Sequence, residues 1–417
     1  MKKTDVIIVG GGPAGLTAAA SIAENTKKNI DITVLEHKDK AGKKLLATGN
    51  GRCNFTNDVL DDMSYRGNKP SFAYKIIDRF DKETLLDFMR KTGVLHTSIN
   101  GYYYPRSLQA ASVLDAINKK LDFLGVNSKC SINVTGIEKK KDMYVVSTDK
   151  SEFCAGCVVI ATGGKSYKSL GSDGSGFKLA KALGHTITEL YPSLTGLKAE
   201  GLDFKMCSGV RARGRIEIIV KNDTVCCAEG ELQFADYGIS GIPVFQISRY
   251  ASQNLARGNK VAALIDLAAE YDVIDIKEII TDILKSNSRQ TILGALNAFI
   301  PQKLARAVLK RQRVDEESGF KQIDNGIIIS LASELKQLKI SITGDCGFDK
   351  AQVTAGGVST EEIKNSTMES KLMKGLYFAG EVVDVDGNCG GYNLHFAFAS
   401  GAVAGKAIAE RIEGLDI

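Results

Sequence analysis

Apolar positions near both ends of the chain form unbroken runs that lead into glycines. TDVIIVGGGPAGLTAAASIAEN (residues 4–25) contains such a run, a glycine turn and a helix-forming stretch, and NIDITVLEH (29–37) adds a second run. CVVIATGG (157–164) and GLYFAGE (375–381) repeat the change from apolar run to glycine. Continuous apolar runs of this length are typical of strands buried on both faces of a parallel sheet. The pattern therefore predicts an α/β sheet to which both chain ends contribute.

The middle of the chain follows a different pattern. From about residue 192, short alternating runs are broken by turn residues, as in RGRIEIIVKNDTVCCAEGELQFADYGISG, which predicts an antiparallel sheet or small barrel. Apolar residues three and four apart predict helices over 71–91 and 107–124, and 273–338 are expected to be mostly helical. Alternation on either side of a polar turn at 139–142 predicts a hairpin.

These patterns predict an α/β domain built from both chain ends, interrupted by a β-rich, barrel-like and helical insert. The expected segments are 1–191 for the first part of the α/β domain, 192–341 for the insert and 342–417 for the second part. A length of 417 residues fits more than one domain.

Composition and charge narrow the function classes. The net charge of +5 favours anionic ligands but is too small to indicate nucleic acid, and no basic stripe is visible. No run of about 18 apolar residues is present, so we expect no membrane span. MKKTDVIIV leads directly into the glycine turn and is interpreted as a strand rather than a signal peptide. Nine irregularly spaced cysteines then predict reduced thiols and a cytoplasmic protein.

Gly10, Gly12 and Gly15 form a G-x-G-x-x-G motif between the first strand and the first helix. In this context the first glycine makes a tight turn, the second lets backbone amides approach a pyrophosphate, and the third allows close helix packing. Glu36 lies at the end of the second strand, where a carboxylate can accept from a ribose hydroxyl and disfavours a 2′-phosphate. An ordinary glycine turn is the alternative, but the strand, helix and acid together favour dinucleotide binding.

Two later segments favour FAD over NAD in this site. Strands similar to 157–164 and 375–381 occur in large flavoproteins of the glutathione-reductase type, in which a late Gly-acid pair, here Gly380-Glu381, meets the ribityl chain of FAD. GSDGSG (171–176) has the wrong glycine order for a second dinucleotide fingerprint, so no separate nicotinamide domain is expected. A helix beginning near Asn393 would direct its N-terminus at the flavin and stabilise the charge of the reduced ring. The alternative is a glycine turn before an ordinary helix.

Five blocks of sequence are specific enough to indicate a family. They are KKLLATGNGRCNFTN, ATGGKSYKSLGSDGSGF, GELQFADYGISGIPVFQIS, VTAGGVSTEEI and TMESKLMKGLYFAGEVVDVDGNCGGYNLHFAFASG. With them the chain resembles the BaiN-like (YhiN-type) family of FAD-dependent oxidoreductases over nearly its whole length. The resemblance implies a Rossmann-type FAD-binding domain built from both chain ends, with an inserted β-rich, barrel-like and helical domain. It also implies a reductase of conjugated C=C bonds in steroid-like acids or an oxidase of small amino ketones. Three positions depart from the family pattern, with Lys168 for Pro, Asp173 for Thr and His395 for Gln.

The polar segment LLATGNGRCNFTN (45–57) is expected to hold the cofactor. Its Thr48–Asn57 portion would wrap the pyrophosphate and ring edge of the flavin, with Arg52 and the asparagines as donors. A substrate carboxylate and a structural hydrogen-bond role are alternatives for Arg52. No metal site is expected. The full set of expected cofactor contacts is Gly10, Gly12, Pro13, Ala14, Gly15, Glu36, His37, Lys44, Thr48, Gly49, Asn50, Gly51, Arg52, Cys53, Asn54, Thr162, Gly163, Gly164, Gly380, Glu381, Asp386, Gly391, Tyr392, Asn393 and Leu394.

Tyr392 and His395 are the expected catalytic residues, because either could donate a proton after hydride transfer. Packing and hydrogen bonding to the cofactor is the alternative, and it is favoured. GYYYPRS (101–107) would line a substrate cleft or form a packed loop. Cys53 has no nearby second cysteine, so a structural thiol is favoured over a redox role.

The sequence thus predicts a FAD-dependent oxidoreductase acting on a small molecule, without nucleic acid or membrane. NADH or NADPH would act as a transient co-substrate, and the flavin would reduce an activated C=C bond by hydride transfer at N5. An amine or amino-ketone oxidase that produces peroxide is one alternative, and an RNA-associated flavoprotein is another. The sequence does not determine the oligomeric state.

Overall fold

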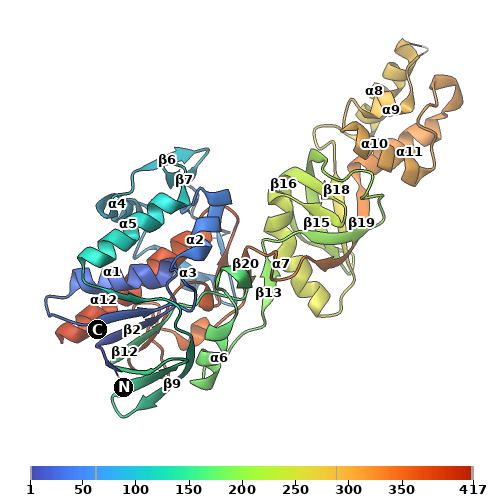
Figure 1. Ribbon diagram of the computed structural model, residues 1–417. Coiled ribbons are helices and arrows are strands. Elements are labelled where there is room, and N and C mark those ends of the chain that lie inside the picture. Colours follow the sequence, from blue (N-terminus) through green and yellow to red (C-terminus); the bar gives the residue numbers. More distant parts are fainter. Residues whose placement is uncertain (1, 62, 288, 415–417) are drawn as a thin grey trace. The chain divides into compact units, whose positions relative to one another are not determined.

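The computed structural model describes residues 2–61, 63–287 and 289–414, which form two compact units (Figure 1). The first unit contains the described residues up to Leu190 and from Val353 onward, and the second is Tyr191–Gln352. Within the described residues, no helix combines the length and the apolar character needed to span a membrane. Each unit has its own hydrophobic core.

A five-stranded parallel sheet in the order β21-β12-β2-β3-β8 forms the centre of the first unit. Every residue of β2, β3, β12 and β21 is buried, which explains why these strands are apolar at every position except Thr33. The predicted α/β class and the predicted strands are confirmed. The strands are β2 (Val6–Val9), β3 (Ile32–Leu35), β8 (Asn127–Lys129), β12 (Cys157–Ile160) and β21 (Leu376–Phe378).

Helices α1 and α12 lie side by side against this sheet (Figure 1). Gly401 and Gly405 of α12 make the close approach possible, because a Cβ on either would collide with the backbone oxygen of Ala14 or Ala18. The helices of the first unit are α1 (Pro13–Asn25), α2 (Lys43–Ala47), α3 (Pro70–Ile77), α4 (Lys82–Thr92), α5 (Ala110–Phe123), α6 (Ser175–Ala182) and α12 (Tyr392–Glu413).

The helical stretch predicted over 71–91 is two helices, α3 and α4. The chain leaves the helical conformation before Asp81, whose side chain accepts from the backbone N–H of Thr84 at 2.8 Å and caps the start of α4. The predicted hairpin is present as β9 (Val134–Lys140) and β10 (Met143–Thr148). These strands belong to a second sheet in the order β1-β11-β10-β9. Its remaining strands are β1 (Lys2–Lys3) and β11 (Glu152–Ala155).

A three-stranded sheet in the order β4-β7-β6 carries part of the candidate site. Strand β7 (Tyr102–Pro105) pairs with β4 (Thr56–Asn57) on one side and with β6 (His96–Ile99) on the other. The sheet therefore connects the end of the polar segment 45–57 to the three successive tyrosines. The remaining strands of this unit are β5 (Tyr65–Arg66), β20 (Val353–Ala355) and β22 (Asp386–Gly387).

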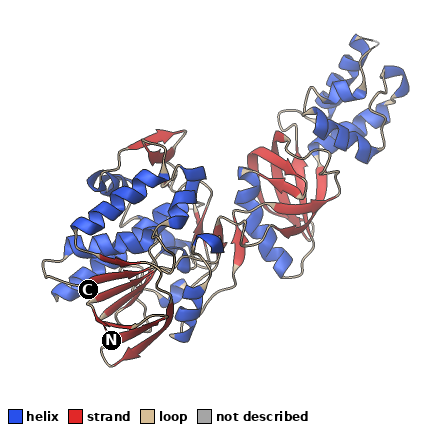
Figure 2. Cartoon of the chain, viewed as in Figure 1, coloured by secondary structure: helices blue, strands red, loops and turns tan. Residues whose placement is uncertain are grey.

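The second unit contains a closed barrel in the order β14-β17-β16-β15-β18-β19 together with a group of helices, as the alternating pattern predicted (Figure 2). The expected boundary at residue 342 falls inside β19, which pairs with β14 and β18 in the barrel, whereas the first unit resumes at Val353. The elements of this unit are β13 (Tyr191–Ser193), β14 (Leu197–Glu200), β15 (Arg211–Val220), β16 (Asp223–Ala235), β17 (Gly238–Ser240), α7 (Ile242–Ala256), β18 (Val261–Asp266), α8 (Val273–Ser286), α9 (Ile292–Leu296), α10 (Gln302–Gln312), α11 (Asn325–Lys336) and β19 (Leu338–Asp345).

Candidate functional site

The glycine motif forms a cradle at the N-terminus of α1. Gly10 has a φ of 109°, and a Cβ on Gly15 would collide with the Gly10 carbonyl oxygen. A Cβ on Gly12, in contrast, would meet no atom of the described residues within 4 Å. Gly12 is the N-cap, and α1 has neither a capping side chain nor an acidic residue in its first turn. Its N–H groups are therefore available to an anion, and the cradle fits a pyrophosphate.

The carboxylate of Glu36 lies beside this cradle and is held by two backbone N–H groups. Its Oε2 accepts from the backbone N–H of Gly11 at 2.8 Å, and its Oε1 accepts from that of Lys38 at 2.8 Å. The side chain is buried, and the neighbouring His37 ring lies 3.5 Å from Oε1. A carboxylate oxygen accepts more than one hydrogen bond, so this geometry leaves room for a ribose hydroxyl.

Glu381 joins three segments that are far apart in sequence. It follows β21, and its Oε2 lies 2.6 Å from Lys44 Nζ on α2. Its Oε1 accepts from the backbone N–H of Thr354 at 2.9 Å and would lie 2.6 Å from a Cβ on Gly164. Thr354 in turn accepts from the backbone N–H of Lys165 at 2.8 Å. Lys44, Gly164 and Glu381 are therefore neighbours, as their shared assignment requires. Thr354 lies in the block VTAGGVSTEEI but was not among the expected cofactor contacts.

Residues 48–52 form the exposed half of the polar segment. Gly49, Asn50 and Gly51 have φ values of 56°, 54° and 81°, a left-handed run for which glycine is best suited. The Arg52 backbone N–H donates to the Gly49 carbonyl at 3.1 Å, while its exposed guanidinium has no ion pair among the described residues. Thr48 donates to the Leu45 carbonyl at 2.6 Å. This half of the segment leaves an unneutralised cation at the surface.

Cys53 begins the buried half. Burial raises the pKa of its thiol to about 12, so the sulfur is protonated and unreactive at neutral pH. Each of the nine cysteines is a free thiol in the structure. These properties favour the structural interpretation of Cys53 over a redox one.

The buried half is attached to both β7 and the start of α12. The Phe55 N–H and the Asn54 side-chain amide donate to the Tyr103 carbonyl at 3.0 and 2.9 Å. The Asn57 side-chain amide donates to the Gly390 carbonyl at 3.1 Å, and a Cβ on Gly391 would lie 2.7 Å from the Thr56 backbone nitrogen. Three segments, 52–57, 102–104 and 388–391, therefore meet at one place.

Helix α12 begins at this meeting point with an uncapped N-terminus. Gly391 is the N-cap, with a φ of 95°, and the first turn contains no acidic residue. Asn393 accepts from the Gly387 N–H and donates to the Gly387 carbonyl, which holds the buried Asp386–Gly387 strand beside the helix. Leu394, the next residue, is half-buried. A helix terminus in this state can stabilise a nearby negative charge.

His395 is completely buried, and both of its ring nitrogens have partners. Nε2 lies 2.9 Å from the Phe80 carbonyl, which only accepts, so Nε2 carries the proton and Nδ1 accepts from the Thr56 hydroxyl at 2.9 Å. Burial lowers the pKa of the imidazole to about 4, so it is neutral at pH 7. This placement suits a structural bridge, and proton donation by His395 stays a prediction.

Tyr392, the other predicted proton donor, is also buried. Burial raises the pKa of its phenol, while the side chain of Ser64 forms a hydrogen bond that opposes the shift. The phenol of Tyr65 donates to the Tyr392 carbonyl at 3.2 Å. The ring is thus held at the start of α12, and its catalytic role also stays a prediction.

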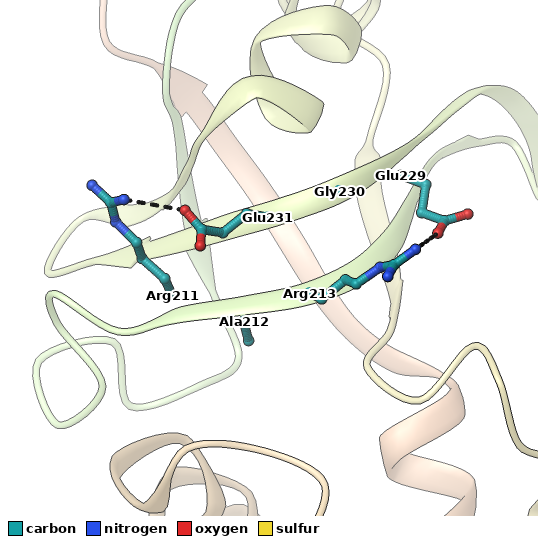
Figure 3. Close-up of a pocket in the computed structure, with 6 residues that line it drawn as sticks. All are labelled: Arg211, Ala212, Arg213, Glu229, Gly230 and Glu231. Carbon is teal, nitrogen blue, oxygen red and sulfur yellow. Dashed lines mark hydrogen bonds and ion pairs between the residues drawn. The ribbon is translucent and has the colours of Figure 1, made fainter. Parts of the chain in front are cut away.

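A separate depression lies on the barrel of the second unit, between β15 and β16 (Figure 3). Its charged side chains pair across the two strands, with Arg211 3.1 Å from Glu231 and Arg213 3.2 Å from Glu229. The depression is a row of exposed ion pairs without a buried polar group that would bind a ligand. Its lining residues are Arg211, Ala212, Arg213, Glu229, Gly230 and Glu231.

Known proteins resemble the chain over nearly its full length. A family model described as the HI0933-like protein Rossmann domain matches residues 4–407. The 3-dehydro-bile acid delta(4,6)-reductase of Clostridium scindens is 37% identical over 404 residues, covering 97% of this chain and 98% of that protein. The ribosomal RNA dihydrouridine synthase of Escherichia coli is 28% identical over 407 residues, covering 96% of each. A solved structure of quinol-fumarate reductase with menaquinol molecules has a TM-score of 0.50 at 16% identity, covering 98% of this chain and 71% of that one, and indicates a shared fold.

Proposed function

The chain belongs to the HI0933-like Rossmann-domain family, and from that premise we propose that it is an FAD-dependent reductase of C=C bonds conjugated with a carbonyl group. The observation that carries the proposal is the 37% identity, over 97% of the chain, to a relative named for reducing a 3-dehydro bile acid. The name of the Escherichia coli relative denotes the reduction of uridine, whose ring double bond is also conjugated with a carbonyl. Both names describe one type of reaction on different substrates.

The cradle and its surroundings would hold FAD. Gly12 and the N-terminus of α1 would bind the pyrophosphate, Glu36 the adenosine ribose, and Glu381 with Lys44 the ribityl chain. The N-terminus of α12 would face the ring, where it would stabilise negative charge. When bound, FAD supplies the hydride for the reduction. Arg52 would supply a positive charge to the cofactor from the exposed half of the polar segment.

A nicotinamide nucleotide is proposed as the reductant that docks transiently. The chain has one G-x-G-x-x-G motif between a strand and a helix, and FAD would occupy it. NADH or NADPH would therefore have to approach the flavin face without a domain of its own. The free thiols are in keeping with the cytoplasmic location that we propose.

A small steroid-like substrate is the first candidate, and uridine in RNA is the second. The second is favoured by the Escherichia coli relative. Against it, the most arginine-rich strand of the second unit is locally neutralised, because Arg211, Arg213 and Arg215 each pair with a glutamate. Binding to RNA depends on unpaired basic groups that contact phosphates.

An anaerobic flavin assay tests the proposal. NADH or NADPH should bleach the flavin of the purified protein, and testosterone or cyclohexenone, both enones, should restore its colour without oxygen. A protein that takes up no FAD would refute the proposal, as would one bleached only by amines and recoloured only by oxygen. Recolouring by a uridine-containing RNA but not by the enones would favour the second candidate.

A further inference from the structure

The three successive tyrosines of β7 divide between its two faces. Side chains alternate along a strand, so Tyr103 points away from Tyr102 and Tyr104. The Tyr103 phenol donates to Asp58 Oδ1 at 2.8 Å, and Lys82 Nζ lies 5.3 Å from the centre of its ring and 2.9 Å from the same Asp58 oxygen. The Tyr103 phenol is therefore occupied within a surface ion-pair network.

Tyr102 and Tyr104 share the face that points to the start of α12. A Cβ on Gly390 would lie 2.8 Å from the Tyr102 ring, and the groups that act on the Tyr104 phenol are Tyr102, Arg52 and Cys389. Both tyrosines are half-buried, and neither phenol has a hydrogen-bond partner among the described residues. Tyr104 therefore presents a free O–H where the three segments meet.

The charge state of Tyr104 suits an acid. Burial raises the pKa of its phenol, with Tyr102 and Cys389 acting in the same direction, so the proton is present at pH 7. The positive charge of Arg52 acts in the opposite direction and would stabilise the phenolate once the proton has left. The backbone of β7 is fixed beside this group by the two bonds to the Tyr103 carbonyl.

We propose that Tyr104 is the catalytic acid that protonates the carbon next to the substrate carbonyl. The inference rests on the proposed reduction of a conjugated C=C bond. In that reaction the π bond breaks, the carbon β to the carbonyl receives the hydride supplied by reduced flavin, and the α-carbon receives the proton of the Tyr104 O–H. The phenolate is reprotonated by water, and a nicotinamide nucleotide reduces the flavin again.

Tyr104 fits this role better than the two residues that the sequence indicated. Both nitrogens of His395 have partners inside the protein, and the ring is completely buried. Tyr392 is 7% exposed, and its phenol interacts with Ser64. Of the three side chains, only Tyr104 combines partial exposure with a free O–H and a nearby cation.

The test compares Tyr104→Phe with Tyr103→Phe, a matched control on the same strand. Each FAD-loaded protein is reduced without oxygen and mixed with testosterone or cyclohexenone, and reoxidation of the flavin is followed. Tyr104→Phe should bind FAD and be reduced normally but reoxidise about 100-fold or more slowly, because general acid catalysis typically contributes at least this much. Tyr103→Phe should reoxidise at the wild-type rate.

A second readout separates acid catalysis from a packing effect. In deuterated water the wild type should place deuterium on one face of the α-carbon, whereas the slow product of Tyr104→Phe should carry it on both faces. Normal reoxidation and one-sided labelling in Tyr104→Phe would overturn the role of Tyr104 but leave the proposed function intact. A wild-type protein whose reduced flavin neither enone reoxidises would overturn the proposed function and the inference with it.

Discussion

Replacing His395 with Gln should remove a large part of the acid sensitivity of the fold. The imidazole donates to the Phe80 carbonyl and accepts from the Thr56 hydroxyl, and a Gln amide can likewise donate an N–H to that carbonyl and accept from that hydroxyl. Gln is also the residue usual at this position in the BaiN-like pattern. We therefore expect His395→Gln to match the wild type in stability near neutral pH.

The two proteins should diverge below pH 6.5. Burial lowers the pKa of His395 in the folded state to about 4, against about 6.5 in the unfolded chain, so the unfolded state binds the extra proton. The stability that this group contributes is complete above about pH 6.5 and is lost as the pH falls toward 4. The wild type should therefore lose about 2 kcal/mol of unfolding free energy through this group at pH 5, and about 3 kcal/mol once the pH is well below 4.

Urea unfolding followed by circular dichroism measures this difference. Wild type and His395→Gln are compared near pH 7.5 and near pH 5, with His96→Gln, a substitution of an exposed histidine, as the control. If wild type and His395→Gln lost the same unfolding free energy between pH 7.5 and pH 5, the imidazole would not be the source of the acid sensitivity. Normal FAD content with turnover reduced by orders of magnitude would instead identify His395 as the proton donor.

Two further substitutions probe the cofactor segment and the helix pair. Arg52→Ala should lower FAD occupancy, measured as bound flavin per protein after dialysis, because it removes a cation without a protein partner; unchanged occupancy and turnover would contradict its assignment. Gly401→Ala should lower the unfolding free energy by about 1–3 kcal/mol, because its Cβ would meet the Ala14 backbone, whereas Gly136→Ala, with no atom within 4 Å in the described structure, should not. Equal urea midpoints for the two glycine variants would refute the packing argument.

The parallel sheet and its glycine turns were predictable because their causes are local. Burial on both faces requires an apolar residue at each strand position, and that requirement is visible in Val6–Val9 and Cys157–Ile160. The break at Asp81 also has a local signal, an acidic N-cap before Lys82–Thr92, although the apolar spacing alone obscured it. The position where the insert ends depends on barrel closure by β19, which a pattern within that strand does not reveal.

Much of the site depends on contacts between distant segments. The bonds from Thr354 to Glu381 and from Thr56 to His395 connect residues that have no shared motif. The different roles of Tyr103 and Tyr104 follow from which face of β7 each occupies. Three successive tyrosines do not reveal from the sequence which of them points to which face. The sequence therefore indicated the segments, while the partners of each side chain required the fold.

The pairing of α1 with α12 has a consequence for the order of events during synthesis. Residues 392–413 leave the ribosome after nearly everything that they pack against. The face of α1 that contacts α12 therefore stays uncovered while the second unit is synthesised. The second unit has its own core and can fold first. The cofactor cradle and the helix that would face the flavin ring come together only after α12 has been synthesised, so a growing chain that still lacks α12 is expected to bind FAD weakly or not at all.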